Sequence, residues 1–384
     1  MGFTKLFALL LLLFTFTHLA MADSKCIRNR LRAILGGEEF APIKASAGAF
    51  AQLSSGREMY YVFHRGQRGK PTYVIIHGLG DNLEKLNAMT ENLERAGFGT
   101  FRVDLHGHGK TLQKYLETHE HAPDLIDYRE QVQDVAELIV RAGIKRNRLF
   151  GHSMGGQIVF NVAQNLPKEF RPESIHMAAP YVYRLDGYLR ESALDGRMWL
   201  NASTRFLRDF FGIPSPFADL MMSPMRTTLN MNRGTMQVLN RGGVVDQITR
   251  FRDTWIDFQA DSVVSAAFRN AFLKYDLKKT EFQLSKTERR FLNERVRAAL
   301  AATKGIRDFN VFSPDAKFPP NIPIQLLIGE GDQLVLEDEL DEFAQVMEHK
   351  KYPFETVKIP GTHFFPQTNP EQVTHAIMMF GQQH

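Results

Sequence analysis

Apolar and polar positions along this chain alternate between the period of a strand and the period of a helix. Residues 72–78 are a continuous apolar run that ends in His-Gly, as expected of a strand buried on both faces. Residues 83–97 carry apolar positions at helical spacing and stop at a glycine. Residues 48–64 predict two strands around a Ser-Ser-Gly turn. Farther along, the pattern predicts a strand within 99–109, a helix at 128–143, a strand at 148–153, a helix at 157–167 and a strand at 173–180.

Strands that alternate with helices pair in parallel and place helices on both faces of their sheet. The pattern therefore predicts an α/β fold with a mostly parallel central sheet flanked by helices. From residue 181 to about residue 318 no strand-like run appears, and helical stretches rich in Met and Phe replace the alternation. The sheet resumes at 322–332, and a helix, a strand within 354–364 and a last helix complete it. The expected divisions are a segment outside the fold at 1–22, the first part of the core at 23–180, a large inserted helical cap at 181–318 and the second part of the core at 319–384.

The first 22 residues have the features of a secretory signal peptide. Lys5 precedes an apolar run at 6–19, and Ala20-Met21-Ala22 forms a small-x-small cleavage pattern. The apolar run is shorter than the ~20 residues that span a bilayer. We therefore expect cleavage after Ala22 and export to the periplasm or the exterior, with an uncleaved N-terminal membrane anchor as the alternative.

Composition excludes several classes of protein. The chain of 384 residues is 43% hydrophobic and 23% charged, which is typical of a globular protein rather than a disordered one. Its formal net charge of +4 is small for this length and no nucleic-acid-binding motif accompanies it, so we expect no nucleic-acid partner. Cys26 is the single cysteine, which excludes an intrachain disulfide. No metal or cofactor is expected, because no framework of acids or cysteines at ligand spacing accompanies the histidines between positions 106 and 121.

The strongest chemical signal is a serine between glycines. Ser153 lies in Gly151-His152-Ser153-Met154-Gly155, a G-x-S-x-G pattern between a predicted strand and a predicted helix. The flanking glycines permit the sharp turn of a nucleophile elbow, and the helix N-terminus directs its positive dipole at developing negative charge. We therefore interpret Ser153 as a nucleophile. A glycine-rich turn that happens to contain a serine is the alternative.

A serine nucleophile needs a base, and the base needs a group that orients it. His363 is the candidate base because it follows the last predicted strand, late in the chain. Asp332 follows the preceding strand in a Gly-x-x-Asp turn and can accept the second N–H of an imidazole. Glu330, two residues earlier, is its rival for this role.

Two backbone N–H groups are expected to form the oxyanion hole that such a reaction requires. One belongs to Met154, directly after the nucleophile, and the other to Leu79, in the loop after residues 72–78. A plain turn is the alternative interpretation of the glycines in that loop.

Five segments of the chain together resemble the α/β-hydrolase superfamily: "VIIHGLGDN", "RVDLHGHGKT", "GHSMGG", "IPIQLLIGEGDQLV" and "PGTHF". Within that superfamily they are most similar to the capped monoacylglycerol lipases and lysophospholipases. The resemblance covers about residues 72–180 and 320–384, and the chain order serine, acid, histidine agrees with it. It implies an α/β-hydrolase fold and a serine hydrolase that needs no cofactor. The inserted region departs from the family, because it is larger than a usual lipase cap.

These features lead us to expect an exported serine hydrolase of carboxylic esters that acts through a Ser-His-Asp triad and an acyl-enzyme. Its expected substrate is a small-molecule or lipid ester with an apolar acyl group, and a transient contact with a membrane surface is left open. Because the insertion begins and ends at the carboxyl edge of the sheet, we expect it to cover the nucleophile. Five of its side chains are candidates for an acyl tunnel: Phe206, Phe210, Phe211, Met221 and Met222.

Two other classes of function remain open at this point. The same triad serves amidases, peptidases, thioesterases and acyltransferases, and a fold alone does not separate them. A binding protein that kept the fold without the activity is the further alternative, although retention of all three triad residues argues against it. Nothing in the pattern predicts an oligomeric state.

Overall fold

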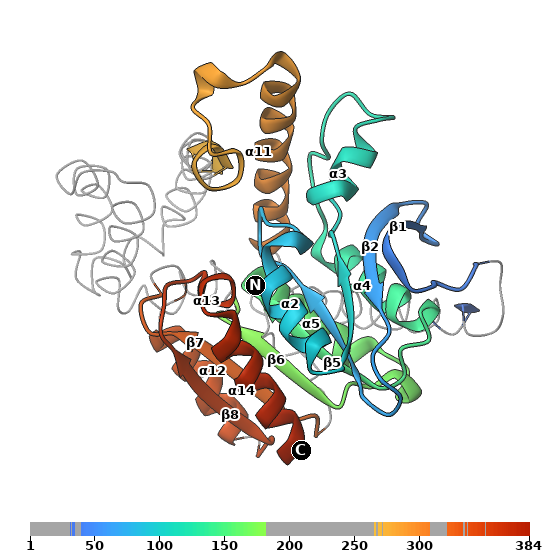
Figure 1. Ribbon diagram of the computed structural model, residues 1–384, viewed down its shortest axis with the longest axis vertical. Coiled ribbons are helices and arrows are strands. Elements are labelled where there is room, and N and C mark those ends of the chain that lie inside the picture. The colour runs from blue at the N-terminus through green and yellow to red at the C-terminus, as the bar shows by residue number, and fades with distance from the viewer. Residues whose placement is uncertain are drawn as a thin grey trace, which may run out of the picture.

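The computed structural model describes residues 40–181, 272–307 and 321–384 except positions 333, 334, 336 and 350, together with isolated positions within 31–34 and 265–270. These parts form a central sheet with helices on both of its faces (Figure 1). The expected signal peptide at 1–22 and much of the expected cap, including residues 182–264, lie outside the described residues.

In this part of the chain, eight strands form one sheet in the order β1-β2-β4-β3-β5-β6-β7-β8. β1 pairs with β2 and β2 with β4 in antiparallel fashion, and all other neighbours are parallel. The bounds are β1 (Ser46–Gln52), β2 (Glu58–His64), β3 (Thr72–Ile76), β4 (Gly99–Val103), β5 (Asn147–His152), β6 (Ser174–Ala178), β7 (Ile324–Gly329) and β8 (Phe354–Ile359).

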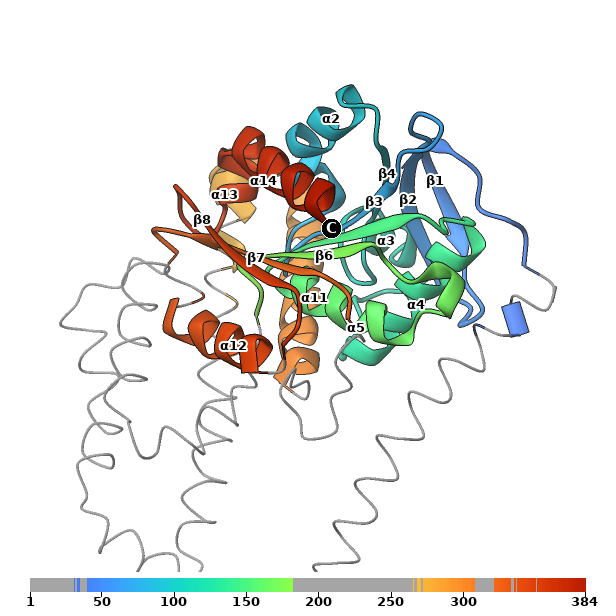
Figure 2. The ribbon, with the colours of Figure 1, turned by 90° about the horizontal axis from the view of Figure 1, so that it is seen from below.

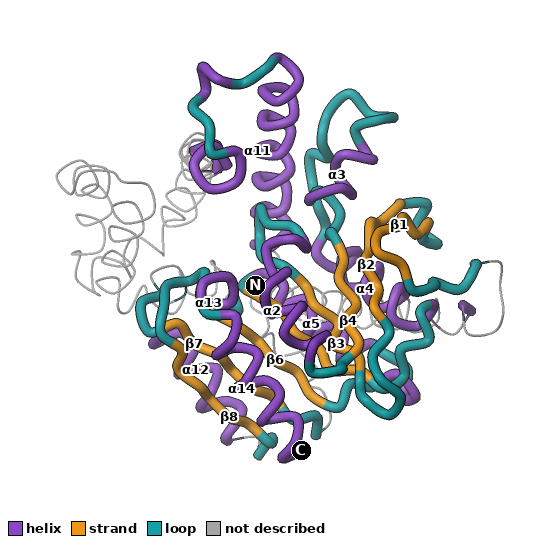
Figure 3. Tube along the Cα trace, viewed as in Figure 1, coloured by secondary structure: helices purple, strands orange, loops and turns teal. Residues whose placement is uncertain are grey.

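The helices cover the two faces of the sheet in separate groups (Figure 2). One face carries α2 (Asn87–Arg95), α13 (Phe365–Thr368) and α14 (Pro370–Gln383), and the other carries α4 (Tyr128–Arg141), α5 (Met154–Asn165) and α12 (Glu337–His349). Two helices, α3 (Gly109–Tyr115) and α11 (Lys286–Arg307), project beyond the sheet (Figure 3). The shorter helical turns are η1 (Leu83–Leu86), η2 (Lys168–Phe170), the π-helix η4 (Phe272–Leu277) and η5 (Glu281–Gln283).

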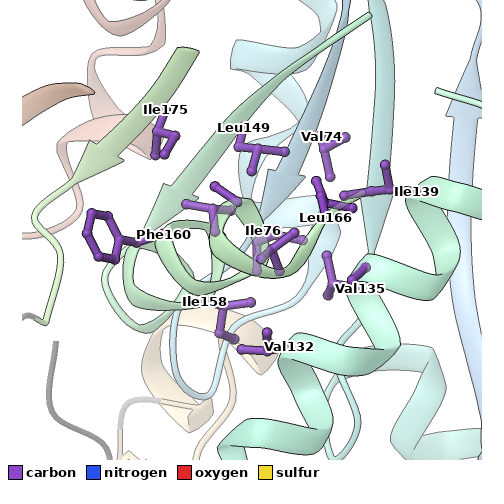
Figure 4. Packing of buried hydrophobic residues seen from close by; sticks show 14 of the residues in the cluster. Val74, Ile76, Val132, Val135, Ile139, Leu149, Ile158, Phe160, Leu166 and Ile175 are labelled. Carbon is purple, nitrogen blue, oxygen red and sulfur yellow. The ribbon is translucent and has the colours of Figure 1, made fainter. Parts of the chain in front are cut away.

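Alternation along the strands gives each face of the sheet its own hydrophobic core. In β3, Val74 and Ile76 are buried on the side of α4 and α5, whereas Tyr73 and Ile75 are buried on the side of α2 and α14. Figure 4 shows the first core, in which Ile158 of α5 lies between the sheet and α4. Removal of apolar area from water on both faces stabilises the parallel strands, which explains why their sequences are almost continuously apolar.

The predicted elements of the core are confirmed, and the short helices α3 and α13 were not predicted. Helix α3 occupies part of a loop for which the sequence predicted no helix. The carboxylate of Asp104 accepts backbone N–H groups of Leu83 and Lys110, each at 2.7 Å, and so organises both loops beside the sheet. Helix α11 lies in a stretch that was predicted to be helical. Among the described helices, none combines the length and the apolar character that crossing a membrane requires.

The topology brings three loops together. β5, β7 and β8 run in the same direction, because β5 pairs in parallel with β6, β6 with β7 and β7 with β8. Loops that follow parallel strands meet at the carboxyl edge of a sheet, where ligands bind in open α/β folds. Ser153, Asp332 and His363 all lie in these loops.

Candidate active site

Ser153 occupies a strained turn between β5 and α5. Its backbone φ of 52° and ψ of −118° are unusual for a residue with a side chain. Three backbone hydrogen bonds hold this conformation. The N–H of Ser153 donates to the carbonyl of Ala178 at 2.8 Å, and the carbonyl of Ser153 accepts the N–H groups of Gly156 at 2.9 Å and Tyr181 at 3.3 Å. The turn therefore has the geometry of a nucleophile elbow.

The glycines around Ser153 are required by close backbone approaches. A Cβ at Gly151 would lie 2.1 Å from the carbonyl oxygen of Gly155, and a Cβ at Gly155 would lie 2.4 Å from the carbonyl oxygen of Ile76. Across the loop, a Cβ at Gly78 would lie only 3.3 Å from the Cβ of Ser153. The loop after β3 thus runs directly beside the elbow.

Asp332 and His363 are joined by a hydrogen bond. The Nδ1 of His363 lies 2.9 Å from the Oδ2 of Asp332, and the two side chains are 7% and 2% exposed. A carboxylate only accepts, so His363 donates from Nδ1, and in the neutral imidazole the lone pair then lies on Nε2. The other oxygen of Asp332 accepts the N–H of Val335 at 3.0 Å. The rival acid Glu330 is exposed to solvent, which favours Asp332 as the partner of His363.

His152 links the elbow to the histidine loop. Burial lowers the pKa of His152 to about 3, so its imidazole is neutral. Its Nε2 donates to the backbone carbonyl of His363 at 2.8 Å, and the two rings lie 5.0 Å apart between centroids. Ser153 and His363 are not hydrogen-bonded to each other in the described structure. Hydrogen bonds of this kind are often long before substrate binds.

The two expected oxyanion donors flank the elbow. Met154 is the first residue of α5, so its N–H has no acceptor within the helix. The carbonyl of Met154 accepts the hydroxyl of Tyr128 at 2.5 Å, which fixes the first turn of the helix. Leu79 follows Gly78 in the loop beside Ser153. Both N–H groups therefore come from segments that border the serine.

Asp81 is a site residue that the sequence analysis did not single out. Burial raises the pKa of its carboxyl to about 7. Its Oδ2 accepts the side-chain N–H of Gln367 at 3.0 Å and lies 3.9 Å from the Nδ1 of His152. An acid directly after the Gly-Leu-Gly loop was the available signal, but its burial depends on contacts with residues far along the chain.

Aromatic side chains of the insertion lie near residues 78–80, the loop that carries Leu79 and is called the oxyanion loop below. Phe206, Phe210, Phe211, Met221 and Met222 lie outside the described residues. Their role therefore stays a prediction. Among the described residues, the rings of Phe268 and Phe272 approach Gly80, and a Cβ there would meet each of them at 3.2 Å. No group of three or more potential metal ligands gathers anywhere in the described segments.

Comparison with protein families matches residues 67–358 to the family described as "Serine aminopeptidase, S33" (Hydrolase_4). The chain belongs to this family. The match includes the parallel strands, Ser153 and Asp332, and ends just before the His363 loop. The expected resemblance to α/β-hydrolases is thereby confirmed, as is the α/β-hydrolase fold.

Two curated relatives of this family member carry names of lipases. One is a monoacylglycerol lipase of Mycolicibacterium smegmatis, 25% identical over 143 residues, which are 37% of this chain and 49% of the relative. The other is the sn-1-specific diacylglycerol lipase ABHD11 of Mus musculus, 26% identical over 145 residues, which are 35% of this chain and 44% of the relative. The chain spans about half the length of the curated relatives it matches.

A solved structure of a hydrolase from Pseudomonas aeruginosa PA01 has the same fold as this hydrolase-family chain. The TM-score is 0.50 at 17% identity, and the alignment covers 88% of this chain and 99% of that chain. At this identity the likeness concerns the fold alone. The large sheet with helices on both faces is therefore the architecture common to the two proteins.

Proposed function

We propose that this protein is a serine hydrolase of carboxylic esters with Ser153, His363 and Asp332 as its triad. The observation that carries the proposal is the 2.9 Å hydrogen bond between Asp332 and His363, at the sheet edge where the elbow presents Ser153. A buried acid that accepts Nδ1–H leaves Nε2 free to take a proton, which is the arrangement that activates a serine.

The chemistry proceeds in two halves. Ser153 Oγ attacks the ester carbonyl while its proton passes to Nε2 of His363, and the N–H groups of Leu79 and Met154 stabilise the oxyanion. Collapse of this intermediate breaks the bond to the alcohol oxygen, which leaves with the proton from His363. A water molecule then attacks the acyl-enzyme with His363 as base, and the acid is released. Asp332 stays ionised and stabilises the imidazolium in both halves.

We further propose that the preferred ester is lipid-like, with an apolar acyl group. Both curated relatives are named as lipases, and Phe268 and Phe272 place apolar rings against the oxyanion loop. The family description supports a second candidate, cleavage of an aminoacyl amide on the same triad. Thioester hydrolysis and acyl transfer would use the same acyl-enzyme intermediate. A non-catalytic binding role would not explain the strained backbone of Ser153.

A fluorophosphonate probe tests the nucleophile. The probe should label the wild type and should not label Ser153→Ala, whose melting temperature should stay close to that of the wild type. A folded wild type that resists labelling would favour a binding protein. The substrate class is tested with p-nitrophenyl esters from acetate to palmitate beside an aminoacyl p-nitroanilide. A kcat/KM that rises with acyl length supports the lipid-like ester, and faster cleavage of the anilide supports the peptidase.

Export is part of the same proposal. It rests on the charge, the apolar run and the small-x-small site within residues 1–22. Expression of the full chain followed by sequencing of the mature N-terminus tests it. A mature chain that begins at Asp23 supports secretion, whereas a retained Met1 in a membrane fraction supports the N-terminal anchor.

A further inference from the structure

Arg295 of helix α11 makes three contacts close to the oxyanion loop. Its Nη2 donates to the carbonyl oxygen of Gly80 at 3.2 Å and to the Oδ2 of Asp276 at 2.6 Å. Its guanidinium carbon also lies 3.8 Å from the centroid of the Phe272 ring. The side chain is only 13% exposed, so these contacts are shielded from water. A planar guanidinium can donate to a carbonyl and a carboxylate and stack on a ring face at the same time, whereas an ammonium is less suited to this combination.

Asp276 joins this cluster to the other end of the loop. Its Oδ1 lies 2.5 Å from the Nζ of Lys85 in η1, which begins three residues after Gly80. The side chains of Asp276 and Lys85 are 17% and 25% exposed. One carboxylate therefore binds a cation from α11 and a cation from the segment that follows the oxyanion loop. Partly buried ion pairs with good geometry are screened less by salt than pairs on an open surface.

The Gly80 carbonyl that Arg295 contacts belongs to a tight turn around Leu79. The N–H of Asp81 donates to the carbonyl of Gly78 at 3.2 Å, which closes a four-residue turn with Leu79 and Gly80 at its centre. Gly80 has a φ of 73°, as the third residue of a type II turn does. Glycine adopts many backbone conformations at little cost. The Nδ1 of His77 holds the Gly78 carbonyl at 2.7 Å, and Arg295 holds the Gly80 carbonyl at the other end of the turn, so the two contacts together restrain its peptide groups.

We propose that Arg295 is a positioning residue for the oxyanion hole. It acts through the carbonyl of Gly80: by fixing this group, it fixes the turn and therefore the direction of the Leu79 N–H. The idea rests on the proposed function, in which that N–H stabilises the oxyanion. Stabilisation of this kind requires the donor to be oriented before charge develops. Loss of the contact should therefore slow the chemical step more than it weakens substrate binding.

Two variants of similar size separate the hydrogen bond from packing. Arg295→Lys retains an N–H donor on a side chain of nearly the same reach, whereas Arg295→Met retains only the bulk. Arg297→Met is the matched control, because Arg297 lies on the same helix with an exposed ion pair to Asp124. Asp276→Asn, which leaves Arg295 in place but weakens its anchoring, gives an independent test should Arg295→Met fold poorly.

The readouts are kcat and KM for p-nitrophenyl butyrate, the inhibition constant of an alkyl boronic acid that forms a tetrahedral serine adduct, and the melting temperature. Arg295→Met should lower kcat by about 10- to 100-fold, somewhat less than removal of a direct oxyanion donor. KM should change by less than about threefold, and boronate affinity should fall in parallel with kcat/KM. Arg295→Lys should recover part of the loss, Asp276→Asn should show an intermediate loss, and Arg297→Met should resemble the wild type.

Three results would overturn the role. Unchanged kcat and boronate affinity in folded Arg295→Met would exclude it directly. Equal losses in the Lys and Met variants would assign the effect to packing against Phe272 rather than to the donor. A rise in KM alone would make Arg295 a contributor to substrate binding. A wild type that neither reacts with the fluorophosphonate nor cleaves any ester removes the proposed function as well, so the two failures are distinguishable.

Discussion

His152 donates a hydrogen bond from Nε2 to the main-chain carbonyl of His363 across 2.8 Å. The residue next to the elbow serine thus holds the loop that carries the proposed base. The donor is a neutral imidazole, because burial lowers the pKa of His152 to about 3. Its protonation state therefore stays constant over the pH range in which esterases work.

Replacement of His152 by phenylalanine should slow catalysis. The ring volume is largely kept, but the carbonyl of His363 loses its donor, and a buried unpaired carbonyl costs about 1–3 kcal/mol. We expect kcat to fall by roughly tenfold as the loop relaxes, with a lower melting temperature. Steady-state kinetics on p-nitrophenyl butyrate checks this. His119→Phe at an exposed position is the control. An unchanged kcat in His152→Phe would show that the carbonyl contact does not position the base.

Asp332→Asn should reduce kcat by about 10⁴-fold, because an amide favours the wrong tautomer of His363. Glu330→Gln should stay within about twofold, since its side chain is exposed and surface changes rarely matter. The pair of variants is compared by kcat/KM at pH 8. A crippled Glu330→Gln beside an active Asp332→Asn would reverse the assignment of the acid.

Asp81→Asn should alter the pH dependence of stability. Burial raises the pKa of Asp81 from its ordinary value of 3.8 to about 7, so the folded state holds this proton more tightly than the unfolded state does. The contribution of this proton to the free energy of unfolding is fully present below about pH 4 and is lost as the pH rises to about 7. Asparagine cannot ionise and still offers an oxygen to Gln367.

The difference in free energy of unfolding between Asp81→Asn and the wild type should therefore shift in favour of the variant when the pH is raised from 4.5 to 8. Urea unfolding at these two pH values measures the gain. Glu330→Gln, which removes an exposed carboxyl, provides the control for net charge. A difference between Asp81→Asn and the wild type that is equal at both pH values would mean that Asp81 does not titrate across this window.

Gly155→Ala should destabilise the fold by about 3 kcal/mol, because its Cβ would press into the backbone of Ile76 where no side chain can move aside. Gly143→Ala is a matched control. Its φ of 66° is unfavourable for alanine, a cost that Gly155 in helix α5 does not carry, but its Cβ would meet nothing within 4 Å, so the total cost should be about 1 kcal/mol. Guanidinium unfolding compares the two. Equal losses of unfolding free energy in the two variants would indicate that the backbone around Gly155 moves to accommodate the added methyl group.

The sheet and the elbow were predictable because their signals are local. An apolar run followed by Gly151-x-Ser153-x-Gly155 specifies a strand, a sharp turn and a helix without reference to the rest of the chain. The position of His363, the proposed base, was predictable from order alone, since a parallel sheet sends the loop after its last strand to the same edge. Local pattern and topology therefore account for most of the fold and for the proposed nucleophile and base.

The remaining parts of the site depend on contacts between distant segments. Asp332 and Glu330 differ little as sequence, and only the path of the loop buries one and exposes the other. The raised pKa of Asp81 follows from burial against segments that include Gln367. Arg295 resembles any surface arginine of an amphipathic helix until the register of α11 against the oxyanion loop is known. Contacts that depend on tertiary structure in this way produce no periodic pattern in the sequence.

The adjacency of β6 and β7 in the sheet has a consequence for the order in which the protein assembles. Residues 179–323 separate the two strands, so synthesis delivers β1 to β6 and helix α5 well before β7 exists. Until then β6, buried along its whole length in the finished sheet, is an open edge. Because long-range pairs close late, the loops of Asp332 and His363 are the last to join. A nascent chain that stops before residue 324 carries Ser153 without the proposed base and acid, so we expect hydrolytic activity to arise only when translation is nearly finished.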